Sequence, residues 1–319
     1  MFDTLGVLAL IGGAALAAWL AARAWQARNR LVKWSGAVVA GLVAALCTAV
    51  LCVSLLGFYR ISFPARRAAV SDLRVAATPE RLARGAHFAA ICAQCHGANN
   101  EPPLVGRNFL GEGAPPIGTI YAANITPTGE IQAWSDGEII RAIREGVHKS
   151  GRALIIMPSE AFRGLSDEDA QSIVVYLRSL SPSGANTPPT TLNVFGAAFI
   201  GAGLAPTAAQ DPITQPIVAP PRGATPEYGK YLARVLGCHV CHGEQLTGGK
   251  AGPGPPPGPS LRAIIPRWSA EDFSRTFRTG VDPYKHTLNE EMMPWKAVSN
   301  FATDDDLTAM YLYLHGLGG

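Results

Sequence analysis

Apolar residues gather in two long runs near the N-terminus of the chain. Residues 4–22 and residues 35–58 contain no charged side chain. A helix of about 20 residues crosses the hydrocarbon core of a bilayer, so each run is long enough to span it. The pattern therefore predicts a membrane anchor of two transmembrane helices within residues 1–66.

The short loop between the two runs is basic. It carries four positive side chains and no acid, at Arg23, Arg28, Arg30 and Lys33. Positive loops tend to stay in the cytoplasm, so the rest of the chain is expected on the opposite, periplasmic side. A cleaved signal peptide is the alternative, but no positive segment precedes the first run. We expect a multi-pass protein of the inner (cell) membrane.

Beyond the anchor, the same order of landmarks occurs twice, in residues 78–181 and 225–317. Each copy opens with Thr-Pro-Glu and passes through Cys-x-x-Cys-His-Gly, Trp-Ser and Met-Pro. It closes with a helix signalled by a Ser or Thr N-cap and by acids in the first turn. Such recurrence indicates a duplicated unit. It predicts an all-α fold in which two tandem domains, residues 67–181 and 225–319, follow the anchor.

The predicted linker, residues 182–224, contains eight prolines, which favour an extended connector. Its centre, residues 192–204, is apolar but too short to cross a bilayer. This centre is expected to pack between the domains or to lie against the membrane, and packing is favoured.

The Cys-x-x-Cys-His motif is typical of c-type haem attachment. Two thiols one helical turn apart form thioethers with the porphyrin, and the following His ligates the iron. A Met commonly fills the sixth position. The sequence thus predicts two covalently attached haem c groups, held by Cys92, Cys95, His96 and Met157 and by Cys238, Cys241, His242 and Met293. His96, Met157, His242 and Met293 are the predicted iron ligands, and Met292 is the alternative to Met293.

Other interpretations of these residues are weaker. A zinc site would need two cysteine pairs in one domain, whereas each pair here stands alone. The five remaining histidines are not expected to be ligands. Arg144 and Arg278 are expected on solvated helix faces, with pairing to a haem propionate as the alternative. Trp134 and Trp268 fit a core position and a propionate contact equally well.

Several segments resemble a known family. Residues 121–127 (YAANITP), followed by WSDGEIIRAIREGV and Met-Pro, resemble the cytochrome c subunits of membrane-bound alcohol, aldehyde and gluconate dehydrogenases. The second copy, with YGKYLARVLGCHVCHG and LNEEMMPW, is similar to class I c-type cytochrome domains. The resemblance implies electron transfer from a dehydrogenase to quinone or another acceptor. The family's three haem motifs and cleaved signal peptide are not matched here, since this chain has two motifs behind a double anchor.

We expect a membrane-anchored dihaem electron carrier, not an enzyme, that passes single electrons between redox partners at the periplasmic face. The favoured setting is a respiratory or photosynthetic complex. The alternatives are the electron-accepting cytochrome subunit of a periplasmic dehydrogenase, a dihaem peroxidase with an open iron position, and a mainly structural anchor. The small net charge of +3 includes no basic block, so nucleic acid is not an expected partner.

Overall fold

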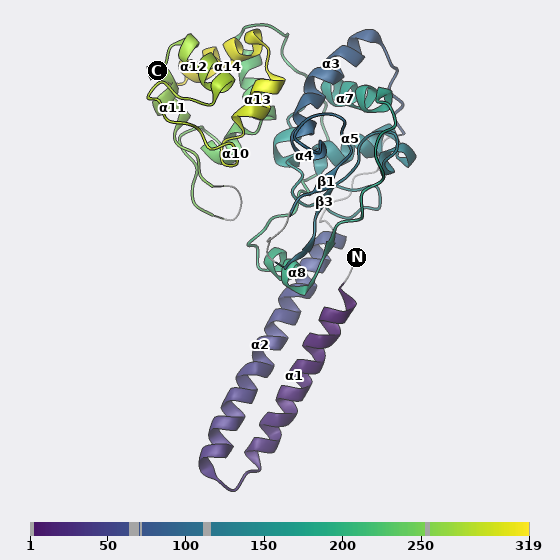
Figure 1. Ribbon diagram of the computed structural model, residues 1–319, viewed down its shortest axis with the longest axis vertical. Coiled ribbons are helices and arrows are strands. Elements are labelled where there is room, and N and C mark those ends of the chain that lie inside the picture. Colours follow the sequence, from purple (N-terminus) through teal and green to yellow (C-terminus); the bar gives the residue numbers. More distant parts are fainter. Residues whose placement is uncertain (1–2, 64–69, 71, 111–115, 253–255, 319) are drawn as a thin grey trace. The chain divides into compact units, whose positions relative to one another are not determined.

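The computed structural model describes residues 3–63, 70, 72–110, 116–252 and 256–318 (Figure 1). The chain divides into two compact units. The first comprises Met1–Phe63, Asn108–Tyr121 and Pro188–Thr207, and the second comprises Pro64–Arg107, Ala122–Thr187 and Ala208–Gly319. The predicted border between anchor and first domain, at residues 66 and 67, lies outside the described residues.

In the first unit, helices α1 (Thr4–Trp25) and α2 (Arg30–Ser62) run along each other as a hairpin (Figure 1). Asp3 and Asn29 cap their N-termini by accepting hydrogen bonds from backbone amides. Both helices are long and apolar enough to cross a membrane. Their apolar side chains are mostly exposed, which fits a hairpin that meets lipid.

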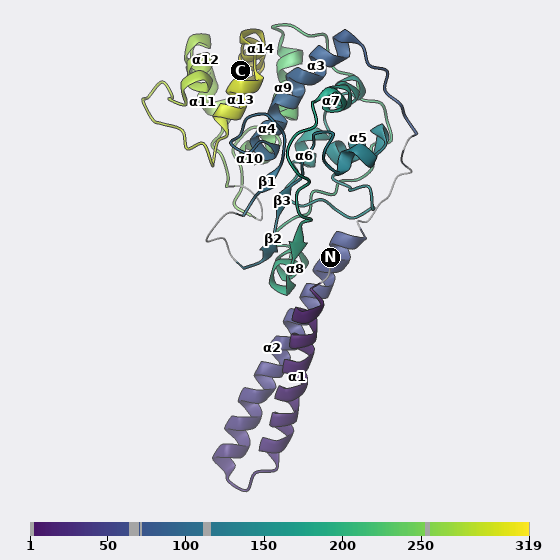
Figure 2. The ribbon, with the colours of Figure 1, turned by 45° about the vertical axis from the view of Figure 1, so that its right-hand side comes forward.

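The apolar centre of the linker forms helix α8 (Val194–Gly201), which packs on α2 (Figure 2). Gly57 of α2 lies so close to the backbone of Ala197 that a Cβ would not fit. The Ser54 hydroxyl donates a 2.8 Å hydrogen bond to the Val194 carbonyl. The expectation that this segment packs between the two domains was therefore wrong, because small residues on both helices let it dock on the hairpin.

Among the described residues, four short strands accompany the helices. β2 (Gly118–Thr119) pairs antiparallel with β4 (Thr191–Leu192) in the first unit, with Gly118 opposite Leu192. β1 (Arg107–Asn108) and β3 (Tyr121–Ala122) form a second two-stranded sheet. The described part of the chain is otherwise built from helices and loops.

The second unit contains both repeats, and each repeat has the same helical plan. The first has the elements α3 (Pro79–Ala89), η1 (Ala90–Cys92), α4 (Ala93–His96), η2 (Glu130–Ala133), α5 (Asp136–Glu145), α6 (Ser159–Phe162) and α7 (Asp167–Ser179). The second has α9 (Pro226–Val235), α10 (Cys238–His242), α11 (Leu261–Ile264), η3 (Ile265–Arg267), α12 (Ala270–Thr279), α13 (Trp295–Phe301) and α14 (Asp304–Gly316). The predicted all-α class is confirmed.

A close helix crossing recurs in both repeats. Gly85 of α3 lies against the backbone of Ser172 in α7, and Gly229 of α9 lies against the backbone of Ala309 in α14, with no room for a Cβ at either place. The predicted N-caps Ser166 and Thr303 each accept a hydrogen bond from the amide three residues on. Local caps and one glycine thus set the same first-to-last helix crossing twice.

The two repeats share a continuous apolar core. Phe88 of the first repeat lies edge-on to Tyr231 of the second, with ring centroids 6.3 Å apart. Its ring centroid is 5.6 Å from that of Phe301. Helix α13 packs on η1, and α6 packs on α9, so the helix that follows each Met-Pro contacts the segment before the other repeat's Cys-x-x-Cys-His motif.

Candidate haem sites

The first motif lies on the short helix that follows α3. Cys92 ends η1, and Cys95 and His96 lie in the last turn of α4. The chain reaches this turn from a helix capped by Thr78, whose hydroxyl accepts a 3.2 Å hydrogen bond from the Arg81 amide. The two thiols and the imidazole are therefore presented by one rigid helical turn.

The His96 ring is oriented by the backbone. Its Nδ1 donates to the carbonyl of Ala123 at 2.7 Å, because a carbonyl only accepts. This bond fixes the tautomer and leaves Nε2 with a free lone pair. Burial also lowers the pKa of His96, so the ring is neutral near pH 7, which is the form that ligates a metal.

The second motif repeats this arrangement on α10. His242 Nδ1 donates to the carbonyl of Pro259 at 2.7 Å, and burial lowers the pKa of this ring as well. Gly258 passes so near the ring that a Cβ there would lie 2.7 Å from its Nδ1 and Cε1 atoms. A glycine is needed at this position to let the backbone reach the imidazole.

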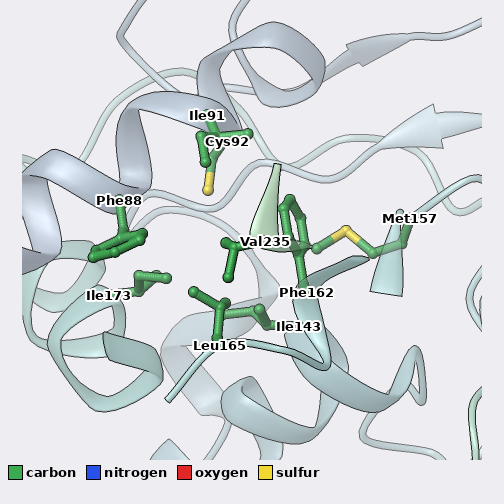
Figure 3. Close-up of a pocket in the computed structure, with 9 residues that line it drawn as sticks. All are labelled: Phe88, Ile91, Cys92, Ile143, Met157, Phe162, Leu165, Ile173 and Val235. Atoms are coloured by element: carbon green, nitrogen blue, oxygen red, sulfur yellow. The ribbon is translucent and has the colours of Figure 1, made fainter. Parts of the chain in front are cut away.

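Met157 and Cys92 line one cavity in the first repeat (Figure 3). The other walls are apolar, formed by Phe88, Ile91, Ile143, Phe162, Leu165, Ile173 and Val235. Val235 belongs to α9, so the second repeat contributes a wall to the cavity of the first. Figure 3 shows the two sulfur atoms on different sides of this apolar space.

The two neighbouring methionines of the second repeat differ in environment. Met293 is partly buried and packs against the shared core, whereas Met292 is 54% exposed. The Met293 amide donates a 2.8 Å hydrogen bond to the Asn289 carbonyl, which holds the loop before α13. Met293 is therefore the member of this pair that faces the interior of the domain.

The thiols are poorly suited to thiolate chemistry. Burial raises the pKa of Cys92 and that of Cys238 to about 12. Dithiol redox exchange needs a thiolate, which such burial disfavours. A buried thiol is compatible with a thioether bond.

Buried polar atoms without a protein partner provide a further test of whether a haem fits. The indole Nε1 atoms of Trp268 and Trp295 are buried and have no hydrogen-bond acceptor among the described residues. A buried donor without a partner costs free energy, so these two groups suit an acceptor such as a propionate. Trp134, by contrast, is a core residue that lies edge-on to the His148 ring.

The expectation of a solvated helix face was wrong for Arg144 and holds for Arg278. Arg144 is only 5% exposed, and its guanidinium donates to Asp167 at 2.7 Å. Arg278 is exposed and donates to Asp304 at 2.8 Å and to the Ala302 carbonyl at 2.9 Å. Each arginine ties the helix before the Met loop to the start of the last helix, because the first-turn acid lies within its reach.

Two of the five histidines that were not expected to be ligands occupy positions largely shielded from solvent. His87 lies between Phe88 and Phe301 where the repeats meet, and His239 is buried beside two glutamates.

The two cysteines outside the motifs, Cys47 and Cys52, lie within α2 as expected.

Comparison with known proteins agrees with this geometry. Residues 80–177 match the family described as Cytochrome C oxidase, cbb3-type, subunit III, and residues 226–318 match Cytochrome c. A nicotinate dehydrogenase subunit of Pseudomonas putida is 32% identical over 260 residues, covering 75% of this chain and 21% of that protein. Gluconate 2-dehydrogenase cytochrome c subunit of Pantoea cypripedii is 28% identical over 277 residues, covering 75% and 58%.

Alcohol dehydrogenase (quinone), cytochrome c subunit, of Gluconacetobacter polyoxogenes is 28% identical over 271 residues, covering 73% of this chain and 55% of that protein. The chain thus spans less than two thirds of the length of these relatives. Two cytochrome c domains carry two covalent haem c groups, as predicted from the two motifs. The chain is a tandem two-domain c-type cytochrome, homologous to the cytochrome c subunits of alcohol, gluconate and fructose dehydrogenases.

Proposed function

We propose that this protein is the membrane-anchored electron-carrying subunit of a periplasmic dehydrogenase complex. It takes single electrons from a dehydrogenase partner and passes them to the next acceptor, without catalysing substrate oxidation itself. The relatives that carry dehydrogenase names support this role over a respiratory or photosynthetic complex, which the sequence favoured. The matched imidazole geometry in both repeats is the observation that carries the electron-transfer role.

The haem irons supply a one-electron couple between Fe(III) and Fe(II). In our assignment His96 and Met157 would ligate the first iron, and His242 and Met293 would ligate the second. Cys92, Cys95, Cys238 and Cys241 would hold the two porphyrins. The backbone carbonyls that accept from each imidazole orient it and increase its basicity, and the apolar walls exclude water. A Met in each repeat that would ligate the iron disfavours the peroxidase alternative, which needs an open position.

We further propose a multi-pass inner-membrane location with the haem domains, residues 67–181 and 225–319, on the periplasmic side. Residues 1–66 anchor them and residues 182–224 connect them. Support comes from the basic turn of the hairpin, where Lys33 lies over the Trp25 ring at 4.5 Å and Trp34 lies 5.0 Å from it. Lys and Arg are enriched in cytoplasmic loops, and Trp is enriched at both membrane interfaces.

Haem reduction in native membranes tests the proposed partner class. Membranes from the source organism and from a strain lacking the gene are mixed separately with gluconate, an alcohol, fructose and nicotinate. One of these substrates is expected to reduce c-type haem in the wild-type membranes. The same substrate should reduce much less c-type haem in membranes of the deletion strain. Reduction that depends on quinol alone, with no response to any dehydrogenase substrate, would favour the respiratory setting instead.

A further inference from the structure

A cluster of three potential metal ligands lies where the two cytochrome c domains meet, apart from the proposed iron ligands. Its members are Glu160 of α6, His239 of α10 and Glu244, which follows α10. One ligand atom from each lies within 4.8 Å of the other two. The cluster therefore combines one carboxylate of the first domain with an imidazole and a carboxylate of the second.

His239 has an unusual setting for a histidine of this chain. It is only 5% exposed, and neither ring nitrogen has a hydrogen-bond partner among the described residues. His96 and His242 each use Nδ1 to reach a carbonyl. A buried polar group without a partner is costly, and native proteins seldom leave one. The imidazole thus has a ring nitrogen without a protein partner within 4.8 Å of two carboxylate oxygens.

Local packing holds the three groups near one another. Gly237 precedes the motif with a left-handed backbone, and a Cβ there would lie 3.1 Å from the Ala161 side chain of α6. Glu160 is the neighbour of Ala161, so α6 is placed firmly beside α10. Arg234 donates to Glu244 Oε2 at 2.7 Å, which orients this carboxylate and leaves its second oxygen available.

We propose that Glu160, His239 and Glu244 form a binding site for a divalent transition-metal ion such as zinc. Imidazole and carboxylate ligands suit zinc, whereas calcium and magnesium prefer oxygen ligands alone. Zinc binds nitrogen and oxygen at about 2.0–2.2 Å, so the ligand atoms, now up to 4.8 Å apart, must move closer together to share one ion. The two glutamates are exposed and free to make this movement, and water completes the coordination.

An ion at this site would link the two haem domains. Glu160 lies three residues after Met157, and His239 lies between Cys238 and Cys241. A bound cation therefore adds positive charge next to the attachment segment of one haem and the Met loop of the other. Positive charge disfavours the oxidised iron, so zinc is expected to raise the midpoint potential of at least one haem.

Zinc titration of the detergent-purified full-length holoprotein, freed of metal by a chelator, tests the site. Isothermal titration is expected to show saturable binding of one zinc ion per chain. Glu160→Gln and Glu244→Gln should each weaken binding about tenfold or more, since loss of even outer-shell groups costs about 10–100-fold. His286→Ala is the matched control, because His286 also lies beside a carboxylate, 2.9 Å from Asp282, but is exposed.

Two results would overturn the proposal. One is the absence of saturable zinc binding, and the other is binding that Glu160→Gln leaves unchanged. Because His239 lies within a haem motif, Glu160→Gln is the primary variant, and its haem content is checked by pyridine haemochrome. The second readout is redox titration with and without zinc, in which the upward shift expected for the wild type should be lost in Glu160→Gln.

Discussion

His87 Nε2 lies 3.4 Å from Asp306 Oδ2 across the contact between the two cytochrome c domains. A counterpart exists on the other side of this contact, where the Tyr231 hydroxyl donates to Asp169. Each acid is the third residue after the N-cap of the last helix of its domain. The first helix of each domain thus bonds or approaches the last helix of the other, as in a pseudo-twofold dimer.

Burial of His87 at this contact predicts that acid weakens the contact between the two domains. Burial lowers the pKa of His87, although Asp306 acts in the opposite direction. Arg222 and Arg84 also disfavour the charged ring, and Asp169 favours it. Because the pKa of His87 is lowered from 6.5 by folding, the unfolded chain binds more of this proton just below that pH. The contribution of His87 to stability is therefore constant above about pH 6.5 and falls as the pH drops below it.

His87 binds a single proton, so it changes the free energy of unfolding by at most about 1.4 kcal/mol per pH unit. The fall is measured by chemical denaturation of the holoprotein between pH 7 and pH 5. His87→Gln should flatten this part of the profile, whereas His315→Gln, which changes an exposed histidine, should not. An unchanged slope in His87→Gln would show that other groups cause the acid sensitivity.

Removing the Tyr231 hydroxyl should destabilise the domain pair. Tyr231→Phe keeps the ring but leaves the buried Asp169 carboxylate without one donor, although the Ser166 hydroxyl and Arg84 still reach it. The expected loss is about 1.5–3 kcal/mol, the usual contribution of a hydrogen bond to a charged group. Denaturant titration measures it, and Tyr284→Phe on the exposed surface is the control.

The two adjacent methionines should respond differently to substitution. Met293→Leu removes the proposed sixth ligand of the second iron, so half of the haem should become high-spin and lose the methionine-to-iron charge-transfer band. The midpoint potential of the second haem should fall, because the thioether that is lost favours Fe(II). Met292→Leu, at an exposed position, should leave the spectrum unchanged. The opposite pattern would assign Met292 as the ligand.

Enlarging Gly57 should release α8 from α2. Gly57→Val places a side chain against the Ala197 backbone, where no Cβ fits. We expect faster chymotrypsin cleavage at the exposed Phe195 and Phe199 of the holoprotein in detergent. Gly41→Val is the matched control in the same helix, because nothing lies within 4 Å of a Cβ at Gly41. Equal cleavage rates in both variants would contradict this account of the packing.

The sequence predicted what depends on local signals. Cys-x-x-Cys-His motifs, N-caps such as Ser166 and Thr303, and the uncharged runs each specify a local structure, and together they indicated the repeat and the fold. The position of α8 was not predicted, because its apolar composition would suit several partners. The fit of Gly57 to Ala197 and the hydrogen bond from Ser54 to Val194 decide among them.

The residues that pair across the two domains could not be predicted from the sequence either. The reason is visible when the two repeats are aligned. Aligning the repeats on Cys92 and Cys238 places His87 opposite Ala233. Aligning them on the helix crossings at Gly85 and Gly229 places His87 opposite Tyr231, which is its structural counterpart. The second repeat has extra residues between α9 and its motif. An alignment on the motifs therefore misses the correspondence of His87 with Tyr231, which the helix contacts reveal.

The most direct test of the central claim is haem quantification on the detergent-purified protein. A pyridine haemochrome assay with reduced and oxidised spectra counts the covalent haems and reports their ligation. We expect two haem c groups per chain, both low-spin and with the methionine-to-iron band in the oxidised form. One haem per chain, or a high-spin fraction that binds small ligands in the unmodified protein, would contradict this claim.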